Sequence, residues 1–133
     1  MNLNKITIVV PCYNEEKYID KLTDKLISQC NSLNLDYEII FVEDGSSDNT
    51  FNEIKKKINQ NKKIKLIKLS RNYGSHVAIS AGIENSYESD LIIICPLDDI
   101  EIGNLFSKLI EKYNEGNEIV WTVRKTRNKN FFL

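Results

Sequence analysis

Five short apolar runs divide the chain, at residues 6–10, 37–42, 64–69, 91–95 and 118–123. Most of their residues are β-branched, and the runs are nearly continuous instead of alternating with polar positions. Strands buried on both faces of a parallel sheet have this pattern, because neither face meets water. The pattern therefore predicts five buried strands.

The segments between the runs carry apolar residues at the three- and four-residue spacing of amphipathic helices. Asp48 is placed to cap the second helix, and Gly116 is placed to end the fourth. The third is rich in small residues between positions 78 and 82, which would let it pack close to the sheet. The predicted helices cover residues 18–27, 48–60, 75–87 and 102–114.

Alternating strands and helices predict a three-layer α/β domain with a mainly parallel sheet and right-handed crossovers. The chain has 133 residues, enough for one domain with a core and too few for two. We therefore treat residues 1–133 as a single domain.

Composition narrows the class further. Apolar residues make up 41% and charged residues 28% of the chain, as in soluble globular proteins. The net charge of −1 gives no reason to expect nucleic acid as a partner. The three cysteines match no metal or redox spacing, which favours reduced thiols and a cytoplasmic location. We find no signal peptide and no apolar run of transmembrane length.

Polar residues follow every predicted strand. They occupy positions 11–16, 43–48, 70–75 and 96–101, and Arg124 follows the last run. Each group alone has an ordinary explanation as a turn or a helix start. Together they would meet at the carboxyl edge of the sheet, where open parallel sheets bind ligands.

Some of these residues suit a nucleoside. Glu43 and Asp44 can accept hydrogen bonds from ribose hydroxyls or from a base N–H. Tyr13 offers a face on which a base can stack. Ser46 can bond to the backbone or to a ligand.

Others suit a diphosphate. The guanidinium groups of Arg71 and Arg124 can grip phosphate oxygens. Asp98 and Asp99 are hard oxygen ligands suited to Mg²⁺ or Mn²⁺, although an acidic pair at a helix start has the same appearance. His76, the only histidine, opens a predicted helix and is interpreted as structural.

Three segments together resemble the family 2 glycosyltransferases of the GT-A fold, and most of all their dolichyl- and polyprenyl-phosphate sugar transferases. The segments are VVPCYNEE at 9–16, FVEDGSSDNT at 41–50 and LSRNYGSHVAISAGI at 69–83. The resemblance implies a Rossmann-like GT-A domain that ends before its acceptor-side region. The chain would then be the nucleotide-sugar-binding part of such a domain.

The resemblance also implies roles for single residues. Glu43 and Asp44 would contact the base or ribose, and Arg71 would help to hold the donor. Asp98 would bind the metal and Arg124 would approach the phosphates, both as catalytic residues. The residues implied to bind the nucleotide sugar are Pro11, Tyr13, Glu15, Glu43, Asp44, Ser46, Arg71 and Asp98.

One motif departs from the family pattern. Pro96 stands where the first Asp of the metal-binding D-x-D motif is expected, and Asp98 stands at the last position. Asp99 or Glu101 could then serve as a substitute ligand. A bound Mg²⁺ or Mn²⁺ is still implied, with fewer protein ligands.

The implied activity is inverting transfer of a sugar from a nucleoside diphosphate sugar to a polyprenyl phosphate or a glycan hydroxyl, in cell-envelope glycan synthesis. The general base and any membrane-attached region would lie beyond residue 133, so this chain alone would bind donor and turn over little. The full-length protein would be cytoplasmic, at the inner face of the membrane.

Two alternatives remain. Pro96 is compatible with a non-catalytic module that binds a nucleotide sugar or another protein. Another class of α/β nucleotide-binding domain is disfavoured, because the turn after the first run has no glycine-rich fingerprint and the chain has no P-loop motif.

Overall fold

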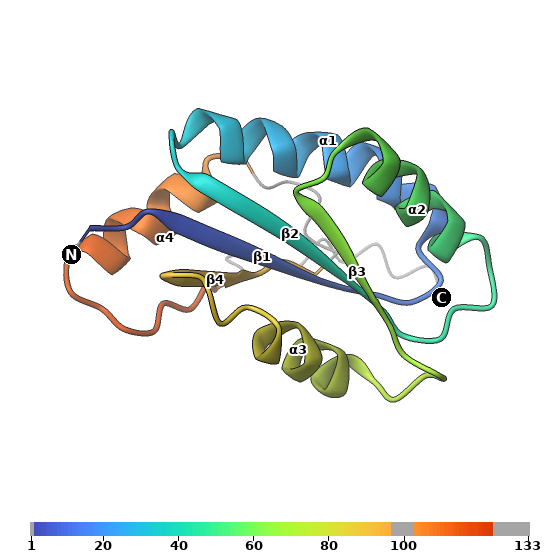
Figure 1. Ribbon diagram of the computed structural model, residues 1–133. Helices are drawn as coiled ribbons and strands as arrows, with labels where there is room; N and C mark the ends of the chain where they lie inside the picture. The colour runs from blue at the N-terminus through green and yellow to red at the C-terminus, as the bar shows by residue number, and fades with distance from the viewer. Residues whose placement is uncertain (1, 97–102, 124–133) are drawn as a thin grey trace, which may run out of the picture.

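The sheet of the computed structural model, which describes residues 2–96 and 103–123, has four parallel strands in the order β3-β2-β1-β4. The strands are β1 (Lys5–Cys12), β2 (Asp36–Glu43), β3 (Ile64–Lys68) and β4 (Leu91–Ile94), and they alternate with the helices α1 (Glu16–Ser32), α2 (Thr50–Gln60), α3 (Ser75–Glu84) and α4 (Leu105–Asn114). Helices α1, α2 and α4 lie on one side of the sheet and α3 lies on the other (Figure 1). The expected three-layer α/β architecture is confirmed.

Alternate residues of each strand enter two separate cores. Ile6 and Ile8 of β1 pack with Phe106 of α4 and with residues of α1 and α2 in the larger core. Val9 points to the opposite face, where it packs with Ala78 of α3. Burial on both faces explains why the strands have continuous apolar sequences.

Close packing of α3 depends on Gly82. A Cβ atom at this position would lie 2.3 Å from Cγ1 of Val9, which is far inside contact distance. The small residues of α3 therefore let the helix approach β1, as the sequence predicts.

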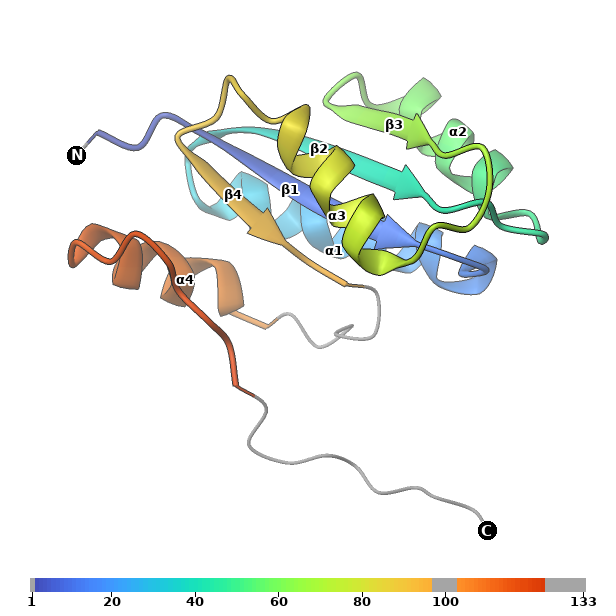
Figure 2. The same cartoon turned by 90° about the horizontal axis from the view of Figure 1, so that it is seen from below.

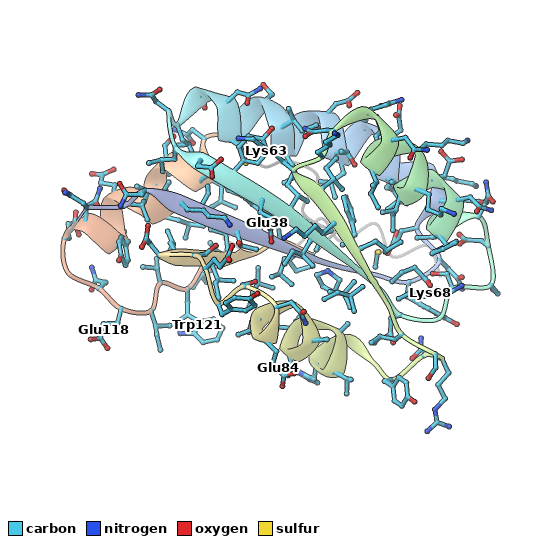
Figure 3. The ribbon with its side chains drawn as sticks, in the orientation of Figure 1. Glu38, Lys63, Lys68, Glu84, Glu118 and Trp121 are labelled. Carbon is cyan, nitrogen blue, oxygen red and sulfur yellow. The ribbon has the colours of Figure 1, made fainter. Side chains whose placement is uncertain are left out.

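The α3 side of the sheet is polar toward the amino ends of the strands. Glu38 on β2 is almost buried there, with Lys65 Nζ at 2.7 Å and Lys5 Nζ at 3.7 Å from its Oε2 atom (Figure 3). These ion pairs neutralise the buried carboxylate. The polar residues on this part of the face therefore have a structural role.

The prediction of a fifth strand at 118–123 is wrong for the described part of the chain. Those residues have no strand partner, and Trp121 is 84% exposed. After α4 the chain runs past that helix and away from the sheet (Figure 2). High β-propensity does not make a strand unless a neighbouring strand supplies hydrogen bonds.

The helix ends agree with prediction to within a few residues. Helix α2 begins at Thr50 and not at Asp48, and α4 begins at Leu105. Asp48 still satisfies the start of α2, because its Oδ1 accepts a hydrogen bond from the backbone N–H of Thr50 at 3.0 Å. Gly116 has a φ of 97° just after α4, and its N–H donates to Tyr113 O, as expected for a C-terminal glycine.

Candidate functional site

Strand register brings three loops together at the carboxyl edge of the sheet. Cys12 at the end of β1 pairs with Glu43 at the end of β2, and Glu43 pairs with Lys68 at the end of β3. The loops that follow these strands therefore leave the sheet side by side. The ends of these strands and the loops after them carry seven of the predicted site residues, namely Pro11, Tyr13, Glu15, Glu43, Asp44, Ser46 and Arg71.

The other three predicted site residues cannot be placed. Asp98, Asp99 and Arg124 lie outside the described residues. Within residues 2–96 and 103–123, no group of three or more His, Cys, Asp or Glu side chains is arranged to hold a metal ion. The predicted metal site thus stays a prediction.

Asn14 joins the first loop to the second. Its backbone has a φ of 51°, and its N–H donates to Ser46 Oγ at 2.9 Å. Its side-chain Oδ1 accepts from the backbone N–H of Ser47 at 2.8 Å. Asn14 is not among the residues predicted from the sequence, although asparagine in a polar turn is a known sign of left-handed backbone.

Asp48 connects the starts of two helices. Its Oδ1 accepts from the N–H of Thr50 in α2, and its Oδ2 accepts from the N–H of Glu16 in α1 at 3.3 Å. Burial alone would raise the pKa of Asp48, but the hydrogen bonds from Thr50 and Glu16 outweigh it and leave the pKa below its usual value. The carboxylate is therefore ionised at neutral pH.

Asp44 joins the second loop to the third. Its Oδ1 accepts from the N–H of Tyr73 at 2.7 Å, and its Oδ2 accepts from the N–H of Gly74 at 3.0 Å. Asp44 is only 4% exposed. Both carboxylate oxygens of Asp44, a residue predicted to contact the nucleoside, thus accept hydrogen bonds from the backbone of a neighbouring loop.

Glu43 is also bonded to the protein backbone. It is 1% exposed, and its Oε1 accepts a hydrogen bond from the N–H of Ser46. This bond closes the turn after β2. The two acidic residues predicted to meet the nucleoside therefore both shape the loops.

Gly45 lets the second and third loops touch. Its φ is 71°, and a Cβ atom there would lie 2.4 Å from both the carbonyl carbon of Arg71 and the nitrogen of Asn72. No other residue fits without moving the backbone. The tight turn that the sequence predicts at Gly45 is confirmed, with a close loop contact that it did not reveal.

Among the described residues of this edge, the side chains of Tyr13, Tyr73 and Arg71 are open to a ligand. Tyr13 and Tyr73 are each nearly half exposed. The Arg71 guanidinium lies over the Tyr73 ring, 4.8 Å from its centre. This arrangement presents aromatic faces and a cation, which can stack on a base and bind an anion.

The cysteines do not add chemistry to the site. All three are free and buried. Burial, with a smaller contribution from Glu43, raises the pKa of the Cys12 thiol well above its usual range, and burial raises the pKa of Cys30 to about 12. Both thiols are therefore protonated and poor nucleophiles at neutral pH.

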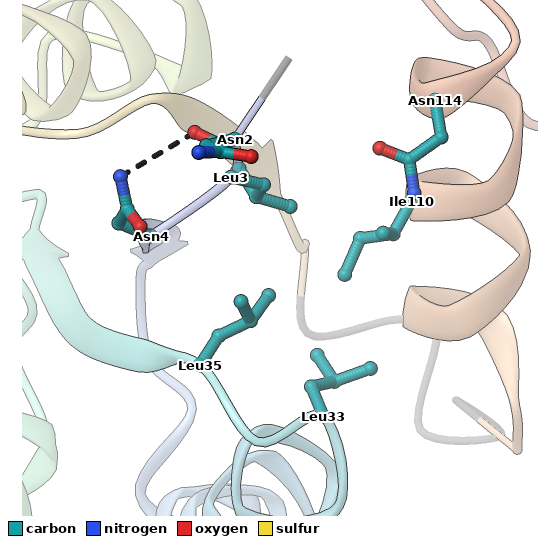
Figure 4. A pocket seen from close by; sticks show the side chains of 7 residues that line it. All are labelled: Asn2, Leu3, Asn4, Leu33, Leu35, Ile110 and Asn114. Carbon is teal, nitrogen blue, oxygen red and sulfur yellow. Dashed lines mark hydrogen bonds between the residues drawn. The ribbon is translucent and has the colours of Figure 1, made fainter.

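A hollow lies at the opposite end of the sheet (Figure 4). It has a volume of about 370 Å³ and lies between the start of β1, the turn after α1, and α4. Its lining residues are Asn2, Leu3, Asn4, Leu33, Leu35, Ile110 and Asn114. None of these carries a charge, so the hollow does not suit a diphosphate.

A parallel α/β sheet with polar, interconnected loops at its carboxyl edge defines the class of α/β ligand-binding domains to which nucleotide-binding proteins belong. Within that class, residues 7–133 match the model of glycosyl transferase family 2. The chain belongs to this family, as its three sequence motifs predict.

Two curated relatives extend this assignment. The chain is 36% identical over 131 residues to an undecaprenyl-phosphate 4-deoxy-4-formamido-L-arabinose transferase of Proteus mirabilis, covering 98% of the chain and 40% of that protein. It is 36% identical over 123 residues to an uncharacterized glycosyltransferase of Synechocystis, covering 92% of the chain and 38% of that protein. The chain thus spans about 40% of the length of these relatives.

Solved structures agree on the fold. A mannosyltransferase of Pyrobaculum calidifontis, solved with GDP-Man and Mn²⁺, superposes with a TM-score of 0.64 at 18% identity over 74% of this chain and 28% of that one. TarS of S. aureus, solved with UDP-GlcNAc, gives 0.60 at 22% identity over 83% of this chain and 32% of that one. The expected GT-A architecture is confirmed.

The described residues include no helix that is both long and apolar enough to cross a bilayer.

Proposed function

We propose that this chain forms the nucleotide-sugar site of a glycosyltransferase that transfers a sugar, with inversion, to a polyprenyl phosphate or a glycan hydroxyl. The observation that carries the proposal is the interconnected edge of three loops, which leaves Tyr13 and Arg71 open to a ligand. Family membership supports the reaction class. The acceptor is suggested by the undecaprenyl-phosphate transferase among the relatives.

In this proposal the nucleoside lies against Pro11, Tyr13 and Glu15, with the base stacked on the Tyr13 ring. Arg71 neutralises the diphosphate from the third loop. Ser46 and the acidic residues Glu43 and Asp44 form the floor between them, and most of their polar atoms already bind backbone groups.

Asp98 and Asp99 are proposed to hold Mg²⁺ or Mn²⁺ against the diphosphate, and Arg124 is proposed to lie near the same phosphates. The ion would supply positive charge at the leaving group. Among the described acids of this edge, Glu43 and Asp44 already accept backbone hydrogen bonds. The proposed metal ligands are therefore Asp98 and Asp99.

Transfer with inversion requires in-line attack by the acceptor oxygen on the side opposite the diphosphate. The residues of this chain would contribute by orienting the donor and by stabilising the developing charge on the leaving diphosphate, as preorganised cations do. A phosphate acceptor is already ionised and needs little help from a base, whereas a sugar hydroxyl requires one.

The test is a thermal-shift panel with UDP, GDP, CDP and dTDP, each with Mn²⁺, Mg²⁺ or a chelator. A ligand that binds only the folded chain raises the melting temperature. We expect one nucleotide to do so in a metal-dependent way. Asp98→Asn should abolish the metal-dependent binding of the nucleotide. Arg71→Ala should weaken nucleotide binding with Mn²⁺, with Mg²⁺ and with chelator.

Asp36→Asn is the matched control for these variants, because Asp36 is an exposed acid at the amino end of β2 whose ion pair is with Lys63. It should bind nucleotide as the unmodified chain does. A panel in which no nucleotide raises the melting temperature would contradict the proposal. Nucleotide binding that does not depend on metal would support the proposed nucleotide site and contradict the proposed metal ligands.

The second candidate function is a non-catalytic nucleotide-sugar or protein-binding module. Pro96 in place of the first metal-binding Asp favours it. A longer protein containing this chain that binds donor but never releases nucleoside diphosphate would support this alternative.

A further inference from the structure

The carboxylate of Asp44 is in an unusual position for a residue expected to contact a nucleoside. It is almost fully buried, and each of its oxygens accepts a hydrogen bond from a backbone N–H of the loop after β3. Hydrogen bonds to an ionised carboxylate are stronger than neutral ones. The carboxylate is therefore a strong link between the loop after β2 and the turn at Tyr73 and Gly74.

We infer that Asp44 is a positioning residue for Arg71, which it places by holding the turn at Tyr73 and Gly74. This inference rests on the proposed nucleotide site and assigns Asp44 a role other than reading the base. The following contacts carry it from one residue to the next.

The first step runs from Asp44 to the turn. Gly74 has a φ of 94°, a conformation that only glycine adopts readily, and the O atom of Gly74 accepts the N–H of Ala78 in the first turn of α3. The two hydrogen bonds to Asp44 hold this turn in place. They also fix where α3 begins.

The second step runs from the turn to Arg71. The Tyr73 backbone is held by Asp44, and its ring lies under the Arg71 guanidinium at 4.8 Å. The Tyr73 hydroxyl is also 3.0 Å from Ser70 Oγ, within the same loop. The guanidinium therefore rests on a ring whose backbone Asp44 has positioned.

Gly45 supports the same loop from below. The backbone at Arg71 and Asn72 packs directly on the Cα of Gly45, with no space for a side chain between them. The loop after β3 is thus held by the hydrogen bonds to Asp44 and by packing against Gly45. The side chain of Arg71 takes part in neither of these two contacts, so its guanidinium can bind an anion.

A positioning role and a base-reading role predict different binding behaviour. If Asp44 acts through Arg71, removing Arg71 makes the Asp44 substitution nearly silent, because coupled residues are not additive. The loss should also be the same for every base. If Asp44 reads the base directly, the two losses multiply and the preference among bases changes.

The experiment measures UDP, GDP, CDP and dTDP affinity by calorimetry for Asp44→Asn, Arg71→Ala and the double variant. We expect each single substitution to lower the affinity for the bound nucleotide about tenfold. The affinity of the double variant should be no lower than that of the single variant with the lower affinity. The relative affinities for the four nucleotides should not change in Asp44→Asn. Multiplied losses or a changed base preference would overturn the inference.

Asp90→Asn is the matched control. Asp90 also accepts two backbone N–H groups, from Asn4 at 2.9 Å and Lys5 at 3.0 Å, but at the amino end of the sheet. It tests the loss of the same kind of hydrogen bonds without the link to Arg71. We expect the nucleotide affinity of Asp90→Asn to equal that of the unmodified chain. A tenfold loss in Asp90→Asn would show that the loss in Asp44→Asn is a general structural effect and would overturn the inference.

Amide hydrogen exchange separates this inference from the proposed function. The N–H groups of Tyr73 and Gly74 should exchange faster in Asp44→Asn than in Asp90→Asn, whether or not any nucleotide binds. If no nucleotide binds the unmodified chain, the proposed function fails, while this measurement still tests whether Asp44 holds the turn at Tyr73 and Gly74. Equal exchange in the two variants would overturn it. Asp44→Glu, which keeps both acceptors one methylene further out, replaces Asp44→Asn if that variant does not fold.

Discussion

At the scale of single residues, the polar side chains of the carboxyl edge bind the protein more than they face solvent. Asn14 and Asp44 each accept a backbone N–H group from another loop, and Asp48 accepts one from the start of α1. Loops at the end of a sheet have backbone donors that no ladder satisfies, and short acidic and amide side chains supply the acceptors. A polar edge is thus a structural requirement as well as a binding feature.

Gly45 offers the sharpest stability test at this scale. Gly45→Ala should lower the free energy of unfolding by about 3 kcal/mol, because the new Cβ adds a backbone overlap to the cost of a positive φ. Chemical denaturation measures the change. Gly116→Ala is the control, since its φ is also positive but nothing lies within 4 Å of its Cβ position.

That control should cost only about 1 kcal/mol. Equal losses at Gly45 and Gly116 would show that the loop contact at Arg71 and Asn72 is looser than described.

The sequence identifies these residues better than it identifies their partners. The turn at Gly45 and the placement of Arg71 at the edge follow from strand order and residue type. The bonds from Asp44 to Tyr73 and Gly74 join positions about 30 apart in the chain, and no local pattern encodes such a contact. Asn14 was missed for the same reason, because its acceptor role depends on a loop that follows the next strand.

At the scale of elements, the presence of a hydrogen-bonded neighbouring strand decides which predicted strands form. The first four runs each have hydrogen-bonded neighbours and are confirmed as β1 to β4. The run at 118–123 has the same composition but no neighbour among the described residues, and it is not a strand. Sequence pattern reports the tendency to pair, and it does not report whether a partner is present.

Gly82 tests how α3 packs on the sheet. Gly82→Ala should lower the free energy of unfolding by about 2 kcal/mol, because the added methyl group overlaps Val9. Ser80→Ala, at an exposed position of the same helix, should change it by less than about 0.5 kcal/mol.

Adding Val9→Ala to Gly82→Ala should cost less than the sum of the two single changes, because the smaller residue at position 9 makes room for the methyl group. Strict additivity in thermal or chemical unfolding would place the Gly82 effect in backbone entropy instead of in packing.

At the scale of the whole molecule, the basic run at 55–68 does not form a continuous positive surface. Four of its lysines are paired with acids: Lys56 with Glu53, Lys57 with Asp20 and Asp24, Lys63 with Asp36, and Lys65 with Glu38. Two others, Lys55 and Lys68, lie over the Phe51 ring. Neighbouring acids therefore offset the charge of these four lysines.

Trp121 reports on the segment after α4. It is the only tryptophan and it is 84% exposed, so native fluorescence should resemble that of a tryptophan in water and should be strongly quenched by iodide. Trp121→Ser should leave the free energy of unfolding within about 0.5 kcal/mol of the unmodified value. A blue-shifted, protected emission would mean that residues 118–123 pack on a sheet or on another molecule.

The carboxylate of Asp48 also constrains how the chain acquires its structure. The N–H groups that it accepts begin two helices whose first residues are 34 positions apart, Glu16 and Thr50. The start of α1 is not complete until the loop between β2 and α2, which carries Asp48, has arrived beside the turn after β1. The first two strand–helix units should therefore reach their native form in one cooperative step, with a folding rate that is limited by closure of that intervening stretch of chain.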